Sequence, residues 1–142
     1  MALPSRPWIL TLLAGLNFTF AFTRLLGGLE ALLHPQQAGS ASTAAGVSVV
    51  YPSVSGQLTL GVLQVLTAIL WALAGVGYLR RSERLGRRLG TGISVFSIAL
   101  GVAMPWLWQL RGLGPLWALG LLHPLVTLYI LNRSHRAAFT EA

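Results

Sequence analysis

The chain contains four apolar stretches that are each long enough to cross a lipid bilayer as an α-helix. A helical span takes about 20 mostly apolar residues, because each residue adds about 1.5 Å across a hydrocarbon core of about 30 Å. The four stretches are residues 7–33, 57–79, 90–110 and 115–132. Their succession along one short chain predicts helices that fold in lipid.

The overall composition also favours lipid as the solvent. Hydrophobic residues make up 54% of the 142 residues and charged residues only 9%, whereas a soluble domain carries about 25% charged residues. We therefore predict an all-α integral membrane protein. Residues 1–142 would form a single domain, an up-and-down bundle of four transmembrane helices with an outer loop at 34–56 and a basic loop at 80–89.

A cleaved signal peptide is the alternative for residues 7–33, with Arg6 as its basic N-terminal region. Arg24 and Glu30 interrupt the approach to any cleavage site, and no small-x-small cleavage motif follows at the usual distance. The sequence therefore favours a first span that is retained.

Five of the ten arginines lie in the link between the second and third stretches. They are Arg80, Arg81, Arg84, Arg87 and Arg88. Short cytoplasmic loops of membrane proteins are enriched in Lys and Arg, and the 34–56 link has no charged residue. We predict a multi-pass protein of the cell (inner) membrane with both termini in the cytoplasm. A basic set without lysine, in an Ala- and Gly-rich chain, is typical of a GC-rich bacterial genome.

The same arginines indicate a partner. Arginines at the cytoplasmic surface attract anionic lipid headgroups by about 1 kcal/mol each. Nucleic acid is disfavoured, because no aromatic residue lies among the arginines and no nucleic-acid-binding motif surrounds them.

Small residues recur every seven positions in the second stretch, at Gly61, Ala68 and Gly75. Small side chains let helix backbones approach closely within a membrane. The third stretch has a comparable set around Ser94 and Gly101. We expect these two stretches to pack as a hairpin, although the same pattern also serves contacts between subunits.

Three polar residues lie inside the spans and are the main candidates for a functional site, because such residues are expensive in a bilayer. From the helical rise we place Arg24 roughly 6 Å, Gln64 about 10 Å and His123 about 12 Å below the outer boundary. Similar depths predict one polar cluster in the outer half. Asn17 shares the face of Arg24, and Thr127 that of His123.

Each member of this cluster has a structural alternative. Arg24 lies near enough to the boundary to extend its side chain to water or lipid phosphate. For Gln64, the alternative is an ordinary interhelical hydrogen bond with no functional role. His123 is followed by Pro124, and it could bond a backbone carbonyl that the proline leaves without a donor.

Glu30 and His34 are four residues apart and so share a helix face. A carboxylate paired with an imidazole can titrate near neutral pH. The simpler interpretation is an interfacial pair at the end of the first span.

The residue set disfavours most chemistry. There is no cysteine, and three scattered histidines give no metal-ligand spacing. Neither a Gly-rich phosphate loop nor a dinucleotide motif occurs. We expect no catalytic activity, metal or cofactor. The predicted function is an accessory or assembly subunit that packs against other membrane helices or itself, and the alternative is a small oligomeric transporter or conductor that uses the polar cluster.

Overall fold

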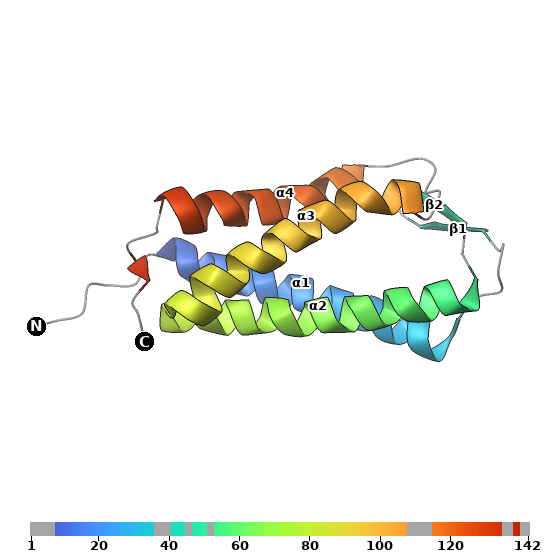
Figure 1. Cartoon of the computed structure of the whole chain (residues 1–142), viewed down its shortest axis with the longest axis horizontal. Coiled ribbons are helices and arrows are strands. Elements are labelled where there is room, and N and C mark those ends of the chain that lie inside the picture. The colour runs from blue at the N-terminus through green and yellow to red at the C-terminus, as the bar shows by residue number, and fades with distance from the viewer. Residues whose placement is uncertain are drawn as a thin grey trace, which may run out of the picture.

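The computed structural model describes residues 8–35, 41–44, 47–50, 53–107, 115–134 and 138–139. Within these residues the chain is mainly helical (Figure 1). The α-helices are α1 (Trp8–Leu33), α2 (Val54–Arg80), α3 (Leu89–Leu107) and α4 (Pro115–Tyr129). Two π-helices, η1 (Glu83–Arg88) and η2 (Ile130–Ser134), precede α3 and follow α4, and two strands, β1 (Ala41–Ala44) and β2 (Val47–Val50), lie between α1 and α2.

The predicted helical class is confirmed, with helix bounds within a few residues of the predicted stretches. Among the described helices, α1 and α2 have the length and apolar composition to cross a membrane, with 26 and 27 residues. The 15 residues of α4 continue directly into η2. α2 begins earlier than predicted because Ser53 caps it, its side-chain oxygen accepting a hydrogen bond from the Gly56 backbone at 3.3 Å.

The helices run alongside one another, with the start of α1, η1 and the end of α4 at one end and the strands at the other (Figure 1). α1 and α2 pack together most extensively. α3 crosses diagonally, from α2 near η1 towards α4 near the strands (Figure 1). We call the end that contains η1 the basic end and the opposite end the strand end.

Glycines allow the backbones of α1 and α2 to approach each other closely. A Cβ atom added to Gly28 would lie 2.9 Å from the Gly61 carbonyl oxygen, and one added to Gly61 would lie 3.0 Å from that of Gly28. A Cβ on Gly75 would meet the Phe18 ring of α1 at 3.1 Å. The prediction that this stripe packs on the third stretch is therefore wrong for Gly61 and Gly75, because both face α1.

The connection expected as a basic loop is largely helical. α2 ends at Arg80 and is capped by Arg81, which has a left-handed conformation with φ of 54°. Ser82 then caps η1, its hydroxyl accepting from the Leu85 backbone at 3.4 Å. A Cβ on Gly77 would lie 2.2 Å from the Gly86 nitrogen, so these two glycines allow η1 to fold directly against α2.

Part of the predicted outer loop is extended. β1 and β2 pair in antiparallel register, with Ala41 opposite Val50 and Ala44 opposite Val47. The alternation of Val47 and Val49 is compatible with an extended piece, but the sequence does not distinguish this from a lid or from a loop that dips to the headgroups. The described residues of the segment take that extended form.

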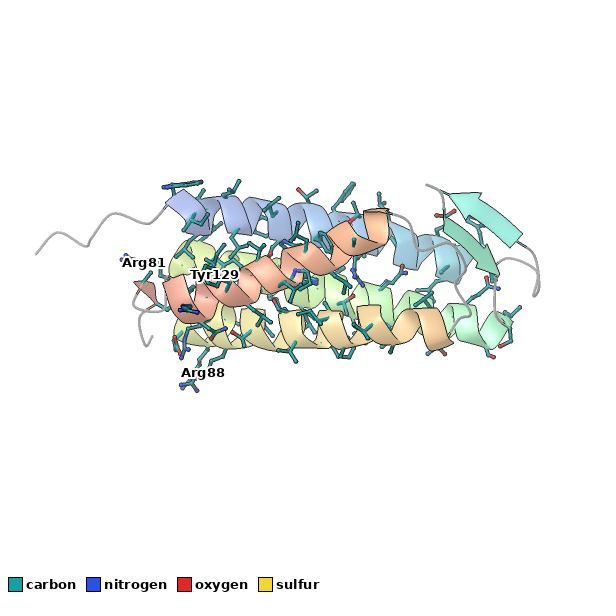
Figure 2. The ribbon with its side chains drawn as sticks, turned by 90° about the horizontal axis from the view of Figure 1, so that it is seen from above. Arg81, Arg88 and Tyr129 are labelled. Atoms are coloured by element: carbon teal, nitrogen blue, oxygen red, sulfur yellow. The ribbon has the colours of Figure 1, made fainter. Side chains whose placement is uncertain are left out.

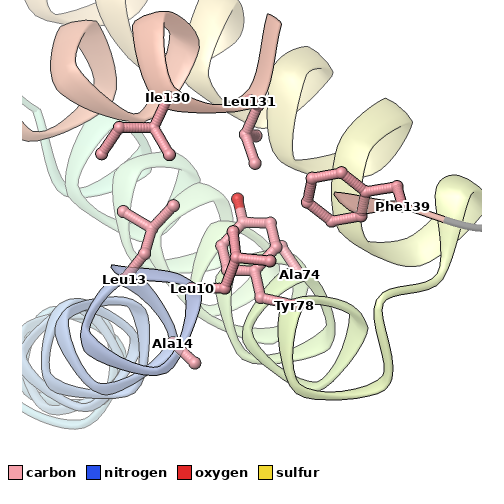
Figure 3. Close-up of a cluster of buried hydrophobic side chains, with 8 residues drawn as sticks. All are labelled: Leu10, Leu13, Ala14, Ala74, Tyr78, Ile130, Leu131 and Phe139. Atoms are coloured by element: carbon pink, nitrogen blue, oxygen red, sulfur yellow. The ribbon is translucent and has the colours of Figure 1, made fainter. Parts of the chain in front are cut away.

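A cluster of apolar side chains fills the interior at the basic end (Figure 3). α1 supplies Leu10 and Leu13, α2 supplies Tyr78, and Leu131 comes from η2. Phe139, near the end of the chain, packs edge-on against Tyr78 with ring centroids 6.4 Å apart. We refer to this set as the apolar plug.

Candidate functional site

His123 of α4 lies between aromatic rings of α1 and α2. Its ring centroid is 4.6 Å from that of Phe20 and 5.0 Å from that of Trp71. Phe20 and Trp71 also meet edge-on at 6.2 Å. Three helices therefore converge on one imidazole.

Asn17 supplies the hydrogen bond that orients this imidazole. His123 Nε2 lies 3.1 Å from Asn17 Oδ1, and Asn17 has no exposed surface. The Asn17 amide nitrogen has no hydrogen-bond partner in the described part of the chain. The bond therefore satisfies His123 and leaves a buried donor open.

The Tyr78 hydroxyl lies beside the same amide without a hydrogen bond of normal geometry. An amide turned by 180° would accept from Tyr78 and donate to His123 instead. The orientation of the Asn17 amide therefore fixes which nitrogen of His123 carries the proton. Asn17 of α1 therefore lies next to polar atoms of both α2 and α4.

Arg24 borders this group through Phe20, which lies four residues earlier on α1. Its guanidinium carbon lies 5.7 Å from the centroid of Phe20, the ring that stacks on His123. No carboxylate or hydrogen-bond acceptor among residues 8–35, 53–107 and 115–134 pairs with Arg24.

Gln64, the third predicted member, packs against α1 one turn beyond Arg24. Its side-chain oxygen would be 3.0 Å from a Cβ on Gly27, so the amide packs against the glycine pair of α1. That oxygen is buried and has no partner within the described residues. The structure thus brings Arg24 and His123 to one ring and leaves Gln64 against α1.

In all, six buried side-chain atoms of the described residues lack a hydrogen-bond partner, including the two just named. They are the amide nitrogen of Asn17, the oxygen of Gln64, the indole nitrogen of Trp71 and the hydroxyls of Tyr78, Ser97 and Thr127. Buried polar groups are satisfied in the great majority of native structures. The two nitrogens can only donate, the Gln64 oxygen can only accept, and the three hydroxyls can do either.

The candidate site is asymmetric along the helix axes. On the basic side of Asn17, the apolar plug closes the interior (Figure 3). Towards the strand end lies Arg24, two helical turns further along α1. The hydrogen-bonded pair of Asn17 and His123 thus lies near the middle of the helices, and the charge of Arg24 lies closer to the strand end.

The predicted pair of Glu30 and His34 is at the strand end of α1, with both residues exposed. The His34 backbone nitrogen donates to the Glu30 carbonyl at 2.9 Å. The two side chains form no ion pair or hydrogen bond in the structure. Glu30 lies in the last turn of α1, and His34 directly follows the helix.

The basic cluster contains an acid that anchors part of it. Arg87 Nε donates to both carboxylate oxygens of Glu83 at 2.8 Å, and Arg88 Nε lies 3.6 Å from the same group. The hydrogen bonds from Arg87 hold the pKa of Glu83 below its ordinary value and raise the pKa of Arg87. Figure 2 shows Arg81 and Arg88 at the same end of the molecule.

The remaining predicted headgroup ligands, Arg80 and Arg84, are exposed. The cluster thus presents cations at the surface, while Arg87 is engaged within η1. Figure 2 also places Tyr129, which is 59% exposed, on α4 towards this end.

Sequence reasoning placed Asn17 on the right face but gave it no role, and it missed Phe20 and Trp71. Asn17 could have been identified in the same way as Gln64, because both are polar residues within an apolar span. The aromatic pair carries no such signal, because apolar rings are expected throughout a span. The described residues hold no group of three metal-ligating side chains.

Comparison of the chain with models of known families, with curated proteins and with solved structures finds no match.

Proposed function

We propose that the chain is a multi-pass protein of the bacterial inner membrane, with α1 to α4 as its spans and both termini in the cytoplasm. Large apolar side chains are exposed on every α-helix, including Phe22, Val54, Phe96 and Leu125. Soluble monomers rarely expose large contiguous apolar patches, whereas lipid chains cover such residues at no cost.

The basic end then faces the cytoplasm. Arg80, Arg84 and Arg88 are exposed there, and each would attract anionic headgroups by about 1 kcal/mol. The strand end, whose 34–56 segment has no charged residue, faces outward. This orientation follows the excess of arginine in cytoplasmic loops.

Within the membrane, we infer a non-enzymatic accessory or assembly role. The observation that carries it is a stripe of exposed apolar residues along α2, spaced three or four apart: Leu58, Val62, Leu66, Ile69 and Leu73. This is the spacing with which one helix packs against another. We call it the α2 stripe, and a helix of another subunit or of a second copy fits it.

Site-specific photocrosslinking in cells tests this role. A photoreactive residue at Leu66, in the α2 stripe, should give a discrete crosslinked protein. The same residue at the buried neighbour Thr67 should give none. A chain that gives no adduct at Leu66, and that purifies alone in mild detergent at every stage, would contradict the accessory role.

A second candidate is a small oligomeric transporter or conductor. It is favoured by the position of Arg24 over Phe20, the ring that stacks on His123, in an interior that holds buried polar atoms without partners among the described residues. Conduction would require the apolar plug to move, since it closes the basic end. If Arg24→Ala and His123→Ala leave every measured flux unchanged, this candidate fails.

A further inference from the structure

Within the part of the chain that the structure describes, Phe139 is held at the basic end by apolar contacts. Its side chain is 9% exposed, and its ring lies edge-on against Tyr78 with centroids 6.4 Å apart. Ala138 packs against the same apolar plug. Neither Ala138 nor Phe139 forms a hydrogen bond or ion pair with any described residue. The ring can therefore leave its position without breaking a directional bond.

The ring lies where α2 and η1 meet. A Cβ atom added to Gly86 would lie 2.7 Å from Phe139 Cε1 and 2.9 Å from the Gly77 carbonyl oxygen. Gly86 is thus in contact with the backbone of α2 and with the phenyl ring. Tyr78, which follows Gly77, is fully buried and faces the same ring (Figure 3). Phe139 therefore covers both the contact between the two helices and the last plug residue of α2.

The other members of the apolar plug belong to helices, whereas Phe139 lies in neither a helix nor a strand. Helical hydrogen bonds fix the backbones of those other members. For Phe139, the free energy gained by burying one phenyl ring is similar in size to the chain entropy lost when the residues that carry the ring are ordered. The bound and released positions therefore differ little in free energy, and we expect both to be populated.

Release of the ring would open the apolar plug at the basic end. With the ring in place, Ala74 and Tyr78 have no exposed surface. The proposed orientation puts this end in the cytoplasm, so water would take the place of the ring beside Tyr78 and Gly86. The same movement would remove a contact of Gly86 at the point where η1 folds against α2.

We propose that Phe139 is a detachable closure of the basic end. Its ring leaves and re-enters the position against Gly86 and Tyr78, and the apolar plug is shielded from the cytoplasm only while the ring is in place. The closure rests on the proposed orientation of the protein, and it requires neither transport nor a partner subunit.

Fluorine NMR saturation transfer tests the detachment in purified, detergent-solubilised protein that carries a fluorinated phenylalanine at position 139. The fluorine should exchange with a minor state of on the order of 1–10% of molecules. The chemical shift of that state should equal the shift of a free fluorinated peptide of residues 133–142. The same label at Phe20, which stacks on His123, should show no such state, because Phe20 would become free only on unfolding.

Tyr78→Leu should raise the minor population about threefold or more, because the edge-on aromatic contact is lost. Tyr129→Leu is the matched control, since it removes the same ring from an exposed position on α4. It should leave the population unchanged.

Thiol labelling tests the shielding. A cysteine at Ala74, within the plug, should react with a water-soluble maleimide about tenfold faster or more when Phe139→Ala is added. A cysteine at Ala68, which is buried in the separate cluster with Trp71, should react at an unchanged rate. Phe139→Leu retains part of the apolar contact and should give a rate at Ala74 between those of wild type and Phe139→Ala.

Absence of exchange at position 139, or equal exchange at positions 20 and 139, would overturn the closure. So would Phe139→Ala that accelerates labelling at neither cysteine or at both equally. Extraction of membranes with alkaline carbonate tests the proposed function separately. A protein released by carbonate contradicts insertion, whereas a retained protein without exchange at position 139 contradicts the closure alone.

Discussion

At the scale of single residues, the contact between Asn17 and His123 joins α1 to α4 through one hydrogen bond in a largely apolar setting. Both partners lie among aromatic and aliphatic side chains, so water does not readily replace either one. Interhelical hydrogen bonds within membranes contribute about 0.6 kcal/mol on average and up to about 1.7 kcal/mol. The contact therefore contributes to stability and, more specifically, to the orientation of His123.

Asn17→Leu should lower the free energy of unfolding by about 1 kcal/mol, because it keeps the γ-branched shape of the side chain but leaves the His123 nitrogen without its partner. Thermal unfolding in detergent measures the change. Thr19→Ala, on the same helix, removes an exposed hydroxyl that bonds only the Gly15 carbonyl and should have almost no effect. A stability of Asn17→Leu equal to that of wild type would mean that the hydrogen bond is not formed.

Glu83 gives the basic end a dependence on pH. Its pKa in the folded protein lies below the ordinary value of about 4.3 because Arg87 donates to it. The stabilisation is therefore complete above that ordinary value and is lost as the pH falls through the lowered pKa. Wild type should melt at a higher temperature than Glu83→Gln at pH 7, with the gap narrowing below about pH 4.

The control for this experiment is Glu30→Gln, since Glu30 is exposed and forms no ion pair with any of the described residues. Its melting temperature should follow that of wild type at both pH values. A gap between wild type and Glu83→Gln that persists unchanged at low pH would exclude the carboxylate as its source.

The polar residues within the spans can be identified from the sequence, but the residues that contact them cannot. Arg24, Gln64 and His123 are conspicuous in apolar spans, and the helical rise gave them similar depths. The choice between Asn17 and Gln64 as the partner of His123 depends on the rotation of each helix about its own axis. That rotation is set by packing of many apolar side chains, and no single polar residue reveals it.

At the scale of the helices, the crossing of α1 and α2 depends on Gly28 and Gly61. Their backbones approach so closely that an added Cβ atom on either would meet the carbonyl of the other. The small-residue stripe predicted a close crossing correctly. It could not identify the neighbour, because small residues permit approach by any helix.

Gly28→Ala should destabilise the protein by about 1–3 kcal/mol, because the methyl group would meet backbone as well as the Val65 side chain. Gly15→Ala is the matched control on the same helix, since a Cβ there meets nothing within 4 Å. It should remain within about 0.5 kcal/mol of wild type. Equal effects of the two substitutions in thermal unfolding would rule out the close crossing.

The connection at the basic end is a second case in which sequence reasoning was incomplete. The arginines indicated a cytoplasmic loop, but Ser82 and Glu83 provide an N-cap and a first-turn acid, and Arg87 lies four residues after Glu83. Those local signals favour a helix over a loop. The prediction of a loop was based on the number of arginines and did not take these capping residues into account.

At the scale of the whole molecule, every proposal depends on lipid as the solvent of these helices and on the cytoplasmic position of the basic end. Two helices have the length and composition of spans, and exposed apolar side chains cover the helices along their length. The arrangement places η1 and the strands at opposite ends (Figure 1). A membrane would therefore separate these two segments.

The chain has no cysteine, so single introduced cysteines report topology without background. Thr43→Cys lies in β1, and Leu85→Cys is exposed in η1. In intact cells, a membrane-impermeant maleimide should label Thr43→Cys, and it should label Leu85→Cys only after the cells are permeabilised. Labelling of Leu85→Cys from outside, or of neither cysteine before permeabilisation, would contradict the membrane fold and its orientation.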